Sequence, residues 1–380
     1  MTEAREPKSL PELLHKLQSD GVPESEYYRH TNRFLELKAR ERGVPMHAHF
    51  ELTPLCNLDC KMCYVHLDGA KFAGRKLLPV EVWKELADQA HRAGTLYISL
   101  TGGECLTYPD FDELYLHIWK KGIRINVLSN GVLMDEARVE FFRRYPPREI
   151  QITLYGSSDD AYEKVTGKRA FAAVKHNLEL LRDADLPVKM AITPNRFMDG
   201  DVLPLLELAE ALNIPYNINA QLIPPREETG REAEHLPLEQ HIELLKIRNR
   251  LKNWELTPID PAELPDENRE GTLQCGMRCG AGKSSCGICY DGRLCPCLSL
   301  SEVSVDALSL GFSEAWRQIN AVASTYPVPA ECTGCVYAVR CLTCAAMHKN
   351  APQPGHRDPR ICERAKAMIS AGIFSLPEQK

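Results

Sequence analysis

Three features are missing from this 380-residue sequence: an excess of basic residues, a high aromatic content and a long apolar run. The formal net charge is −6, and aromatic residues make up only 7% of the chain, with no basic stripe interleaved among them. This composition argues against a nucleic-acid partner. No segment resembles a signal peptide or a membrane-spanning helix, which predicts a cytoplasmic protein without a membrane partner.

Cysteine, by contrast, is abundant, and three cysteines lie within eight residues. Cys56, Cys60 and Cys63 are separated by three and then two residues, and the next cysteine is Cys105. A 4Fe–4S cluster normally takes four thiolates. A cluster held by this loop would therefore keep one iron open to a small molecule. A zinc-binding loop is the alternative interpretation of the same spacing.

A second motif follows the cysteines at the end of an expected strand. Residues 47–53 are expected to form a first strand, residues 79–93 a helix and residues 96–100 a second strand. This second strand leads into Thr101-Gly102-Gly103-Glu104. Paired glycines at a strand end allow the backbone to approach a ligand closely, although a simple turn has the same composition.

Strands and helices continue to alternate after this motif, which predicts right-handed crossovers and a parallel sheet. The further strands are expected at residues 124–128, 150–154, 188–192 and 216–223. The further helices are expected at residues 111–121, 135–144, 171–182 and 202–212.

The order of these motifs, with Met62 before the last cysteine, resembles the radical S-adenosylmethionine (SAM) enzymes. The resemblance implies a partial (β/α)6 TIM-like barrel with its chemistry at the carboxyl ends of the strands. It also implies an open iron that chelates SAM, which is cleaved to a 5′-deoxyadenosyl radical. The residues assigned to cofactor binding are Gly102, Gly103, Glu104, Ser129, Asn130, Tyr64 and Arg169. Lys168 is an alternative to Arg169, and a helix cap or a solvated charge is the non-functional alternative for the polar residues.

The remaining cysteines are concentrated in the last third of the chain. Eleven of the fifteen lie between Cys275 and Cys362. Disulfide bonds are not expected, because the first cysteine loop needs a reducing compartment. Zinc ribbons stay open as an alternative, since paired Cys-x2-Cys units are good zinc sites.

This cysteine pattern resembles the SPASM extension of radical SAM enzymes, which holds two auxiliary 4Fe–4S clusters. The resemblance assigns one auxiliary cluster to Cys332, Cys335, Cys341 and Cys362. It assigns the other, expected to face the barrel, to Cys279, Cys286, Cys297 and Cys344. Two departures are the two-residue spacing before Cys344, where the family has three, and the surplus cysteines. Cys105, Cys275, Cys289 and Cys295 then have no cluster.

The length predicts two or three domains, and a hydrophobic content of 44% is enough for a sizeable core. We expect a helical N-terminal segment (1–45), the barrel (46–252), a linker (253–272), the SPASM domain (273–365) and a tail (366–380). Long apolar runs are few in residues 273–365, so their core is expected to depend on the clusters.

The resemblance implies an enzyme that modifies a peptide, most simply a ribosomally synthesised precursor, with flavodoxin or ferredoxin as reductant. Its products would be thioether or carbon crosslinks or related oxidations. Oxidation of a small molecule is an alternative activity. A non-enzymatic iron–sulfur or zinc protein is an alternative class, but it would leave Gly102–Glu104 without a purpose. No catalytic side chain is assigned.

Overall fold

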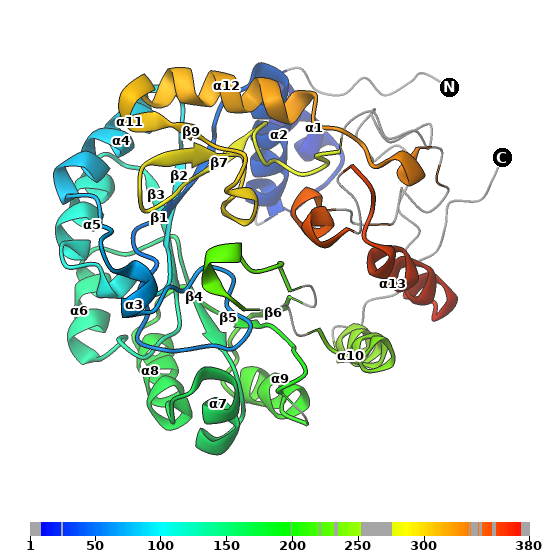
Figure 1. The fold of residues 1–380 in the computed structure, drawn as a ribbon. Helices are drawn as coiled ribbons and strands as arrows, with labels where there is room; N and C mark the ends of the chain where they lie inside the picture. The colour runs from blue at the N-terminus through cyan, green and yellow to red at the C-terminus, as the bar shows by residue number, and fades with distance from the viewer. Residues whose placement is uncertain are drawn as a thin grey trace.

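The computed structural model describes residues 9–23, 26–198, 200–219, 222–231, 235–251, 276–333, 335, 341, 344–351 and 355–373. The expected linker 253–272 and Cys275 lie outside these residues. Figure 1 shows a curved sheet with helices along its outer side and a cysteine-rich region beside its open edge.

One nine-stranded sheet organises the chain, in the order β6-β5-β4-β3-β2-β1-β7-β8-β9. The strands from β6 to β7 along this order are all parallel, whereas β8 and β9 run antiparallel to their neighbours. The strands are β1 (His47–Glu51), β2 (Tyr97–Thr101), β3 (Arg124–Ser129), β4 (Glu149–Leu154), β5 (Val188–Ile192), β6 (Tyr216–Ile218), β7 (Ser285–Ile288), β8 (Arg293–Cys295) and β9 (Val305–Asp306).

The helices that connect the parallel strands cover the outer face of the sheet. They are α4 (Val80–Arg92), α5 (Phe111–Lys120), α6 (Glu136–Arg144), α7 (Asp159–Thr166), α8 (Phe171–Asp183) and α9 (Val202–Ala211). The short α3 (Gly69–Phe72) lies instead at the mouth of the barrel, where Lys71 contacts Thr229 and Phe72 contacts Tyr290. The N-terminal helices are α1 (Leu10–Ser19) and α2 (Tyr27–Arg42), and the later ones are α10 (Leu238–Leu251), α11 (Ala307–Leu310), α12 (Phe312–Ser324) and α13 (Pro359–Ser370).

Alternation along each strand separates an apolar outer face from a more polar inner face. In β1, Ala48 and Phe50 belong to the main hydrophobic core, and Phe50 packs on Trp83 of α4 with ring centroids 5.1 Å apart. His49 and Glu51 alternate with them along the strand and so lie on its other face. The sheet thus presents polar groups where a ligand can bind and buries its apolar residues under the helices.

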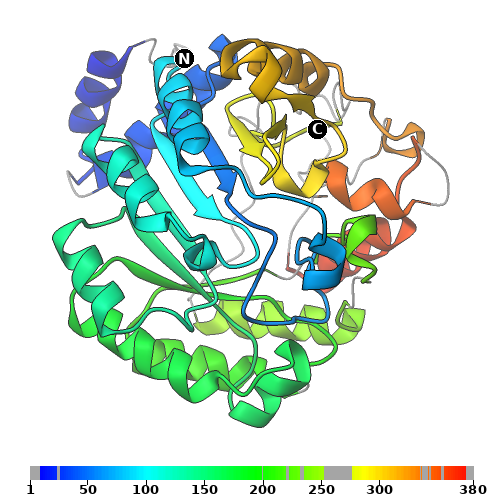
Figure 2. The same ribbon diagram turned by 60° about the vertical axis from the view of Figure 1, so that its left-hand side comes forward.

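The cysteine-rich region continues the barrel instead of standing apart from it. β7 pairs in parallel with β1, placing Cys286 opposite Ala48. Ile288, Phe312 and Trp316 belong to the same core as the barrel strands. Figure 2 shows β7–β9 extending the sheet beyond β1, with α12 along their outer side. The expected boundary at residue 273 therefore does not separate two hydrophobic cores.

The predicted fold class is confirmed: a partial barrel of alternating strands and helices, followed by a cysteine-rich region. β6 is shorter than the expected range 216–223, and α7, β7 and α12 were not expected. Within the described residues, no helix is long and apolar enough to cross a membrane.

Candidate active site

The loop after β1 carries Cys56, Cys60 and Cys63 and is held in place by the end of α7. The backbone N–H groups of Asp59 and Lys61 donate to the carbonyls of Thr166 (2.8 Å) and Val165 (3.0 Å). α7 ends there because Gly167 adopts the left-handed conformation (φ 70°) that closes a helix.

Backbone amides and one side-chain amide point at the sulfur atoms of this loop. The N–H of Leu58 donates to Cys56 Sγ (3.4 Å) and that of His66 to Cys63 Sγ (3.3 Å). Asn130 Nδ2 approaches Cys56 Sγ at 3.6 Å. Hydrogen bonds to sulfur stabilise thiolate and tune iron–sulfur clusters. Burial raises the pKa of the Cys56 thiol to about 12, so the thiolate form requires a cationic partner such as iron. The donor set fits an iron–sulfur cluster.

Gly102 and Gly103 bring the end of β2 against the backbone that precedes Cys56. The N–H of Gly103 donates to the Thr53 carbonyl (2.7 Å) and that of Glu104 to the Leu55 carbonyl (2.9 Å). A Cβ on Gly102 would lie 2.3 Å from the Thr53 oxygen, and one on Gly103 would lie 2.2 Å from the Leu55 oxygen. Both positions therefore require glycine, and the pair forms a cradle beside the cysteine loop.

Glu104 is fully buried, and its carboxylate binds backbone N–H groups in its own turn and at the end of β3. It accepts hydrogen bonds from the N–H groups of Asn130 (2.8 Å) and Leu106 (3.1 Å), and from the Ser129 hydroxyl. Burial raises the pKa of Glu104. Asn130 Nδ2 also donates to Asn57 Oδ1 (2.7 Å). In this structure, Glu104, Ser129 and Asn130 tie β2 and β3 to the cysteine loop.

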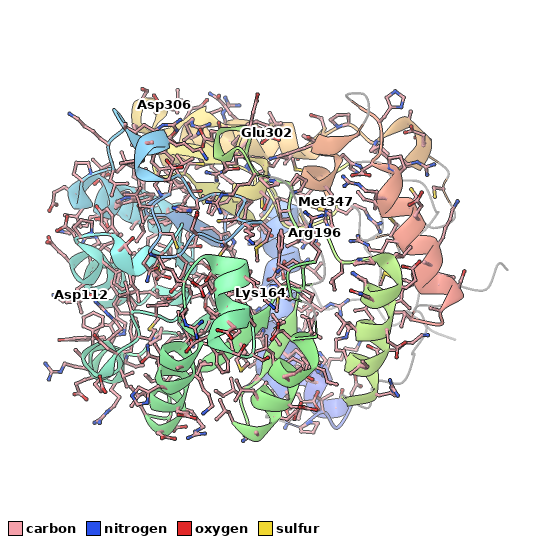
Figure 3. The ribbon with its side chains drawn as sticks, turned by 60° about the horizontal axis from the view of Figure 1, so that its bottom comes forward. Asp112, Lys164, Arg196, Glu302, Asp306 and Met347 are labelled. Carbon is pink, nitrogen blue, oxygen red and sulfur yellow. The ribbon has the colours of Figure 1, made fainter. Side chains whose placement is uncertain are left out.

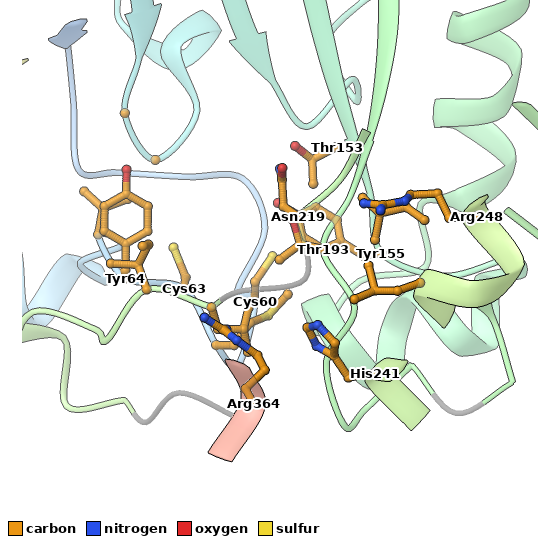
Figure 4. Close-up of a pocket in the computed structure, with 18 of the residues that line it drawn as sticks. Cys60, Cys63, Tyr64, Thr153, Tyr155, Thr193, Asn219, His241, Arg248 and Arg364 are labelled. Carbon is orange, nitrogen blue, oxygen red and sulfur yellow. The ribbon is translucent and has the colours of Figure 1, made fainter. Parts of the chain in front are cut away.

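A cavity of about 640 Å³ opens at the carboxyl ends of the strands, a volume typical of small-molecule sites. Figure 4 shows Cys60 and Cys63 at this cavity, with Tyr64 on one side of them and His241 and Arg248 on the other. Its wall includes Cys60, Met62, Cys63, Tyr64, Gly102, Gly103, Thr153, Tyr155, Thr193, Asn219, His241, Arg248 and Arg364. Tyr64 is thus at the cavity, whereas Glu104, Ser129 and Asn130 are not among its lining residues.

Arg169 is the assigned residue that the structure places elsewhere. It lies in an exposed ion-pair cluster with Asp160 and Glu163 of α7, and the distance to Glu163 is 3.4 Å. In this structure the acidic residues of α7 hold the Arg169 guanidinium, and the assignment of Arg169 to the SAM carboxylate stays a prediction. Lys168 is also exposed.

Three of the four cysteines assigned to the barrel-facing auxiliary cluster come together. Burial raises the pKa of the Cys297 and Cys344 thiols, and the nearby Cys279 thiol adds to the increase in both. Cys286 does not join them. It lies fully buried in β7 on the face that packs into the main core, and burial alone raises the pKa of its thiol to about 12.

The other group, Cys332, Cys335, Cys341 and Cys362, comes together as expected. Burial and the three neighbouring thiols raise the pKa of Cys332 to about 11. Arg357 Nη1 lies 2.9 Å from Cys362 Sγ. Among the described residues, no three His, Cys, Asp or Glu side chains converge on a position for a single metal ion. The thiolates of a 4Fe–4S cluster bind different iron atoms and need no such convergence, in contrast to those of a zinc site.

Sequence reasoning missed a buried ion pair beside the cysteine loop. Glu51 at the end of β1 binds Arg226 through two hydrogen bonds of 2.9 and 2.5 Å. The N–H of Arg226 donates to the Tyr64 carbonyl (3.1 Å). The pKa of the half-buried Tyr64 is raised first by removal of its hydroxyl from water, and the thiols of Cys297 and Cys63 add smaller contributions, so Tyr64 is near both cysteine groups.

Comparison with known proteins identifies the barrel. Residues 50–209 match the Radical SAM superfamily. They form a radical SAM domain. The family resemblance predicted from the cysteine spacing is thus confirmed, and this family uses a 4Fe–4S cluster and SAM.

Two known proteins are similar in sequence to this chain over more residues than the radical SAM domain contains. The subtilosin biosynthesis protein AlbA of Bacillus subtilis (strain 168) is 26% identical over 270 residues, covering 68% of this chain and 56% of AlbA. The sporulation killing factor maturation protein SkfB of the same organism is 25% identical over 272 residues, covering 70% of this chain and 64% of SkfB. The chain thus spans less than two thirds of the length of either relative.

Solved structures share the fold over most of the chain. Streptococcus suis SuiB superposes with a TM-score of 0.66 at 14% identity, covering 91% of this chain and 86% of SuiB. The protein anSMEcpe with bound AdoMet gives a TM-score of 0.66 at 14% identity, covering 87% and 97% of the two chains. The shared fold therefore includes the cysteine-rich region that follows the radical SAM domain.

Proposed function

We propose that this protein is a radical SAM enzyme that modifies a peptide, with one SAM-binding and two auxiliary 4Fe–4S clusters. The single observation that carries the proposal is the cavity that contains Cys60 and Cys63, the Gly102–Gly103 cradle and further open space toward α10 and α13. A cofactor site and a second site for substrate thus share one chamber.

A bound cluster would supply the electron for reductive cleavage of SAM, which is the radical chemistry of this family. The chain's own residues bind and orient the cofactor. Cys56, Cys60 and Cys63 would hold the cluster, and Gly102 and Gly103 leave room for the SAM amino acid part. Glu104, Ser129 and Asn130 would fix the strand ends that face it, and Tyr64 would close one side of the chamber.

The auxiliary clusters are assigned to the two cysteine groups in the C-terminal region. Cys332, Cys335, Cys341 and Cys362 would hold one of them. Cys279, Cys297 and Cys344 would contribute to the other, close to Tyr64 and the first loop. A flavodoxin or ferredoxin would supply the electron, and a reducing cytoplasm would keep these thiols available.

A peptide is the favoured substrate class. AlbA and SkfB take part in bacteriocin biosynthesis and killing-factor maturation, and each matches more than two thirds of this chain. SuiB has been solved with its precursor peptide SuiA. Relatives named for small molecules, a probable GTP 3′,8-cyclase of Aeropyrum pernix and a heme synthase of Methanosarcina barkeri, match only 44% and 46% of the chain.

The radical chemistry is tested with anaerobically reconstituted protein, dithionite and SAM. We expect release of 5′-deoxyadenosine, and its loss when Cys56, Cys60 and Cys63 are all replaced by Ala. The matched control is Cys105→Ala, because Cys105 is buried and outside all three groups. Release that persists in the triple variant would refute the radical SAM assignment.

The substrate class is tested by co-expressing the protein with short open reading frames encoded beside its gene. Mass spectrometry should then detect a peptide that has lost hydrogen, with the triple Ala variant as the unmodified control. Modification of a small molecule in place of any such peptide would contradict the proposal.

A further inference from the structure

A basic patch lies on the surface where the cysteine loop contacts α7. It consists of Lys61, Lys164, Lys168 and Arg196, and all four residues are exposed. The N–H of Lys61 donates to the carbonyl of Val165 (3.0 Å), which places Lys61 beside the last turn of α7 and its Lys164. Figure 3 shows this side of the molecule, with Lys164 and Arg196 labelled.

Phe197 brings two of these cations together. The Lys61 ammonium lies 4.7 Å from the centroid of the Phe197 ring, and the Arg196 guanidinium lies 5.2 Å from it. A cation–π contact attracts a cation to the ring without neutralising its charge. The ring therefore holds two like charges close together at the surface.

The acidic side chains nearest to the patch are bound to other cations. Asp59 pairs with Arg231, and Asp160 and Glu163 pair with Arg169. Within the part of the chain that the structure describes, none of the three lysines of the patch forms an ion pair. The patch is thus a local excess of positive charge in a protein whose formal net charge is −6.

The patch adjoins the cysteine loop but not the cavity. Cys60 lines the cavity, whereas none of the four basic residues does. The residues on either side of Cys60, Asp59 and Lys61, are both exposed. A partner on the patch would therefore come close to a cluster held by this loop while SAM and substrate occupy the cavity.

We propose that the basic patch binds an acidic electron-carrier protein, which delivers its electron to the cluster held by Cys56, Cys60 and Cys63. The carrier gives up one electron, which passes to that cluster, and no covalent bond forms or breaks at this step. Complementary charges steer such partners into contact and make their association depend on ionic strength. This inference rests on the proposed radical SAM function and names the surface that its reductant uses.

An acidic segment of a peptide substrate would carry the same charge as such a carrier. The carrier is favoured, because the patch lies beside the cysteine loop and outside the cavity, where the substrate must reach the radical. The test separates the two partners.

The experiment measures the binding of oxidised flavodoxin, and in parallel of a ferredoxin, to the reconstituted holoenzyme by titration calorimetry. At about 0.05 M salt, the double variant Lys164→Glu/Arg196→Glu should bind the carrier about tenfold or more weakly than the native protein. At about 0.5 M salt the difference should shrink to about threefold or less, because salt screens exposed charges. The rate of cluster reduction by the reduced carrier, followed by absorbance, should fall in the same salt-dependent way.

The double variant Lys120→Glu/Arg144→Glu is the matched control. Lys120 and Arg144 are exposed and lie in the last turns of α5 and α6, as Lys164 does in the last turn of α7. This variant should bind the carrier within about twofold of the native protein. Release of 5′-deoxyadenosine with dithionite, which needs no protein partner, should stay within about twofold in both variants. Lys168 is left unchanged, because it is the alternative to Arg169 at the SAM carboxylate.

Unchanged carrier affinity in Lys164→Glu/Arg196→Glu, or binding of neither carrier to the native protein, would overturn this inference and leave the radical SAM function standing. A loss of peptide modification under dithionite, with unchanged carrier binding, would assign the patch to the substrate and would also overturn it. Absence of 5′-deoxyadenosine from the native protein with dithionite would overturn the proposed function and this inference together.

Discussion

Glu51 and Arg226 form a buried ion pair that connects three parts of the protein. Their two hydrogen bonds measure 2.9 and 2.5 Å, and both side chains are more than nine-tenths buried. Arg226 Nη2 also donates to the Leu298 carbonyl (3.1 Å), next to Cys297. The backbone of Arg226 binds Tyr64. The pair thus joins the end of β1, the first cysteine loop and the C-terminal cysteine region.

Removing one partner of this pair should be costly. Arg226→Met leaves the Glu51 carboxylate buried without its cation, which typically lowers the free energy of unfolding by about 3–5 kcal/mol. The double variant Glu51→Gln/Arg226→Met should recover part of that loss. Anaerobic urea unfolding followed by tryptophan fluorescence measures both. Arg250→Met is the surface control, with an expected change below about 1 kcal/mol. An equally small change for Arg226→Met would contradict the structural role of the pair.

The glycine cradle should not tolerate a methyl group. In Gly103→Ala the new Cβ meets the Leu55 carbonyl at 2.2 Å, and in Gly102→Ala it meets the Thr53 carbonyl at 2.3 Å. The backbone before Cys56 must then move, so we expect 5′-deoxyadenosine formation to fall at least tenfold. Gly69→Ala is the matched control, because nothing lies within 4 Å of its Cβ position. Activity of Gly103→Ala equal to that of Gly69→Ala would show that the close approach is dispensable.

Metal content distinguishes the cluster assignment from a zinc module. Three clusters of four irons predict about 12 irons per reconstituted chain, falling to about 8 when Cys56, Cys60 and Cys63 are replaced by Ala. Cys286→Ala should not lower the iron content, because Cys286 faces the barrel core. Elemental analysis by mass spectrometry provides the counts. Stoichiometric zinc with about 4 irons would assign the C-terminal cysteines to zinc.

The barrel could be predicted from the sequence because its signals are local. Strand β5 coincides with the expected range 188–192, and the Gly102–Gly103 motif falls at the end of β2. Strand β7 could not be found in this way. Its sequence Ser-Cys-Gly-Ile is short and rich in small residues, and its partner β1 is more than 200 residues away.

Which side chains meet at the site also depends on contacts between distant parts of the chain, which the sequence pattern does not reveal. Arg226 lies outside every predicted strand and helix, and its partner Glu51 is 175 residues away. Cys286 matched a ligand spacing, but whether it faces the core or the other cysteines depends on strand register. Arg169 was assigned from the family resemblance, and its ion pair with Asp160 of α7 could not be predicted from that resemblance.

His49 should make the protein acid-sensitive in a defined pH window. Burial, with a smaller effect of His47, lowers the pKa of His49 to about 4, against about 6.5 in the unfolded chain. Between these values the unfolded state binds more protons, so stability is lost as the pH falls below 6.5. From pH 7 to pH 5 this amounts to about 2 kcal/mol. In urea unfolding between pH 7 and pH 5, the free energy of unfolding should therefore fall by about 2 kcal/mol less for His49→Gln than for the native protein. An equal fall in the free energy of unfolding for both proteins would contradict the lowered pKa of His49.

Cluster removal should loosen only part of the C-terminal region. The sequence suggested that all of residues 273–365 depend on clusters, but Ile288, Phe312 and Trp316 belong to the barrel core. The region around Cys341 and Ile361 has only a small core of its own. Metal ligation then supplies much of its folding free energy.

We therefore expect chelation to expose the chain after residue 330 to trypsin while β7, β8 and α12 stay folded. The cleavage sites report this directly, since Arg317 is an exposed residue of α12, whereas Lys349 and Arg357 belong to the cluster-dependent segment. Mass spectrometry of timed digests should find cleavage at Lys349 and Arg357 well before Arg317, and no such order in the holoenzyme. Phe312 and Trp316 hold α12 in the barrel core, so loss of thiol ligation alone should not open this helix. Simultaneous cleavage at all three sites after chelation would therefore mean that α12 also depends on the clusters.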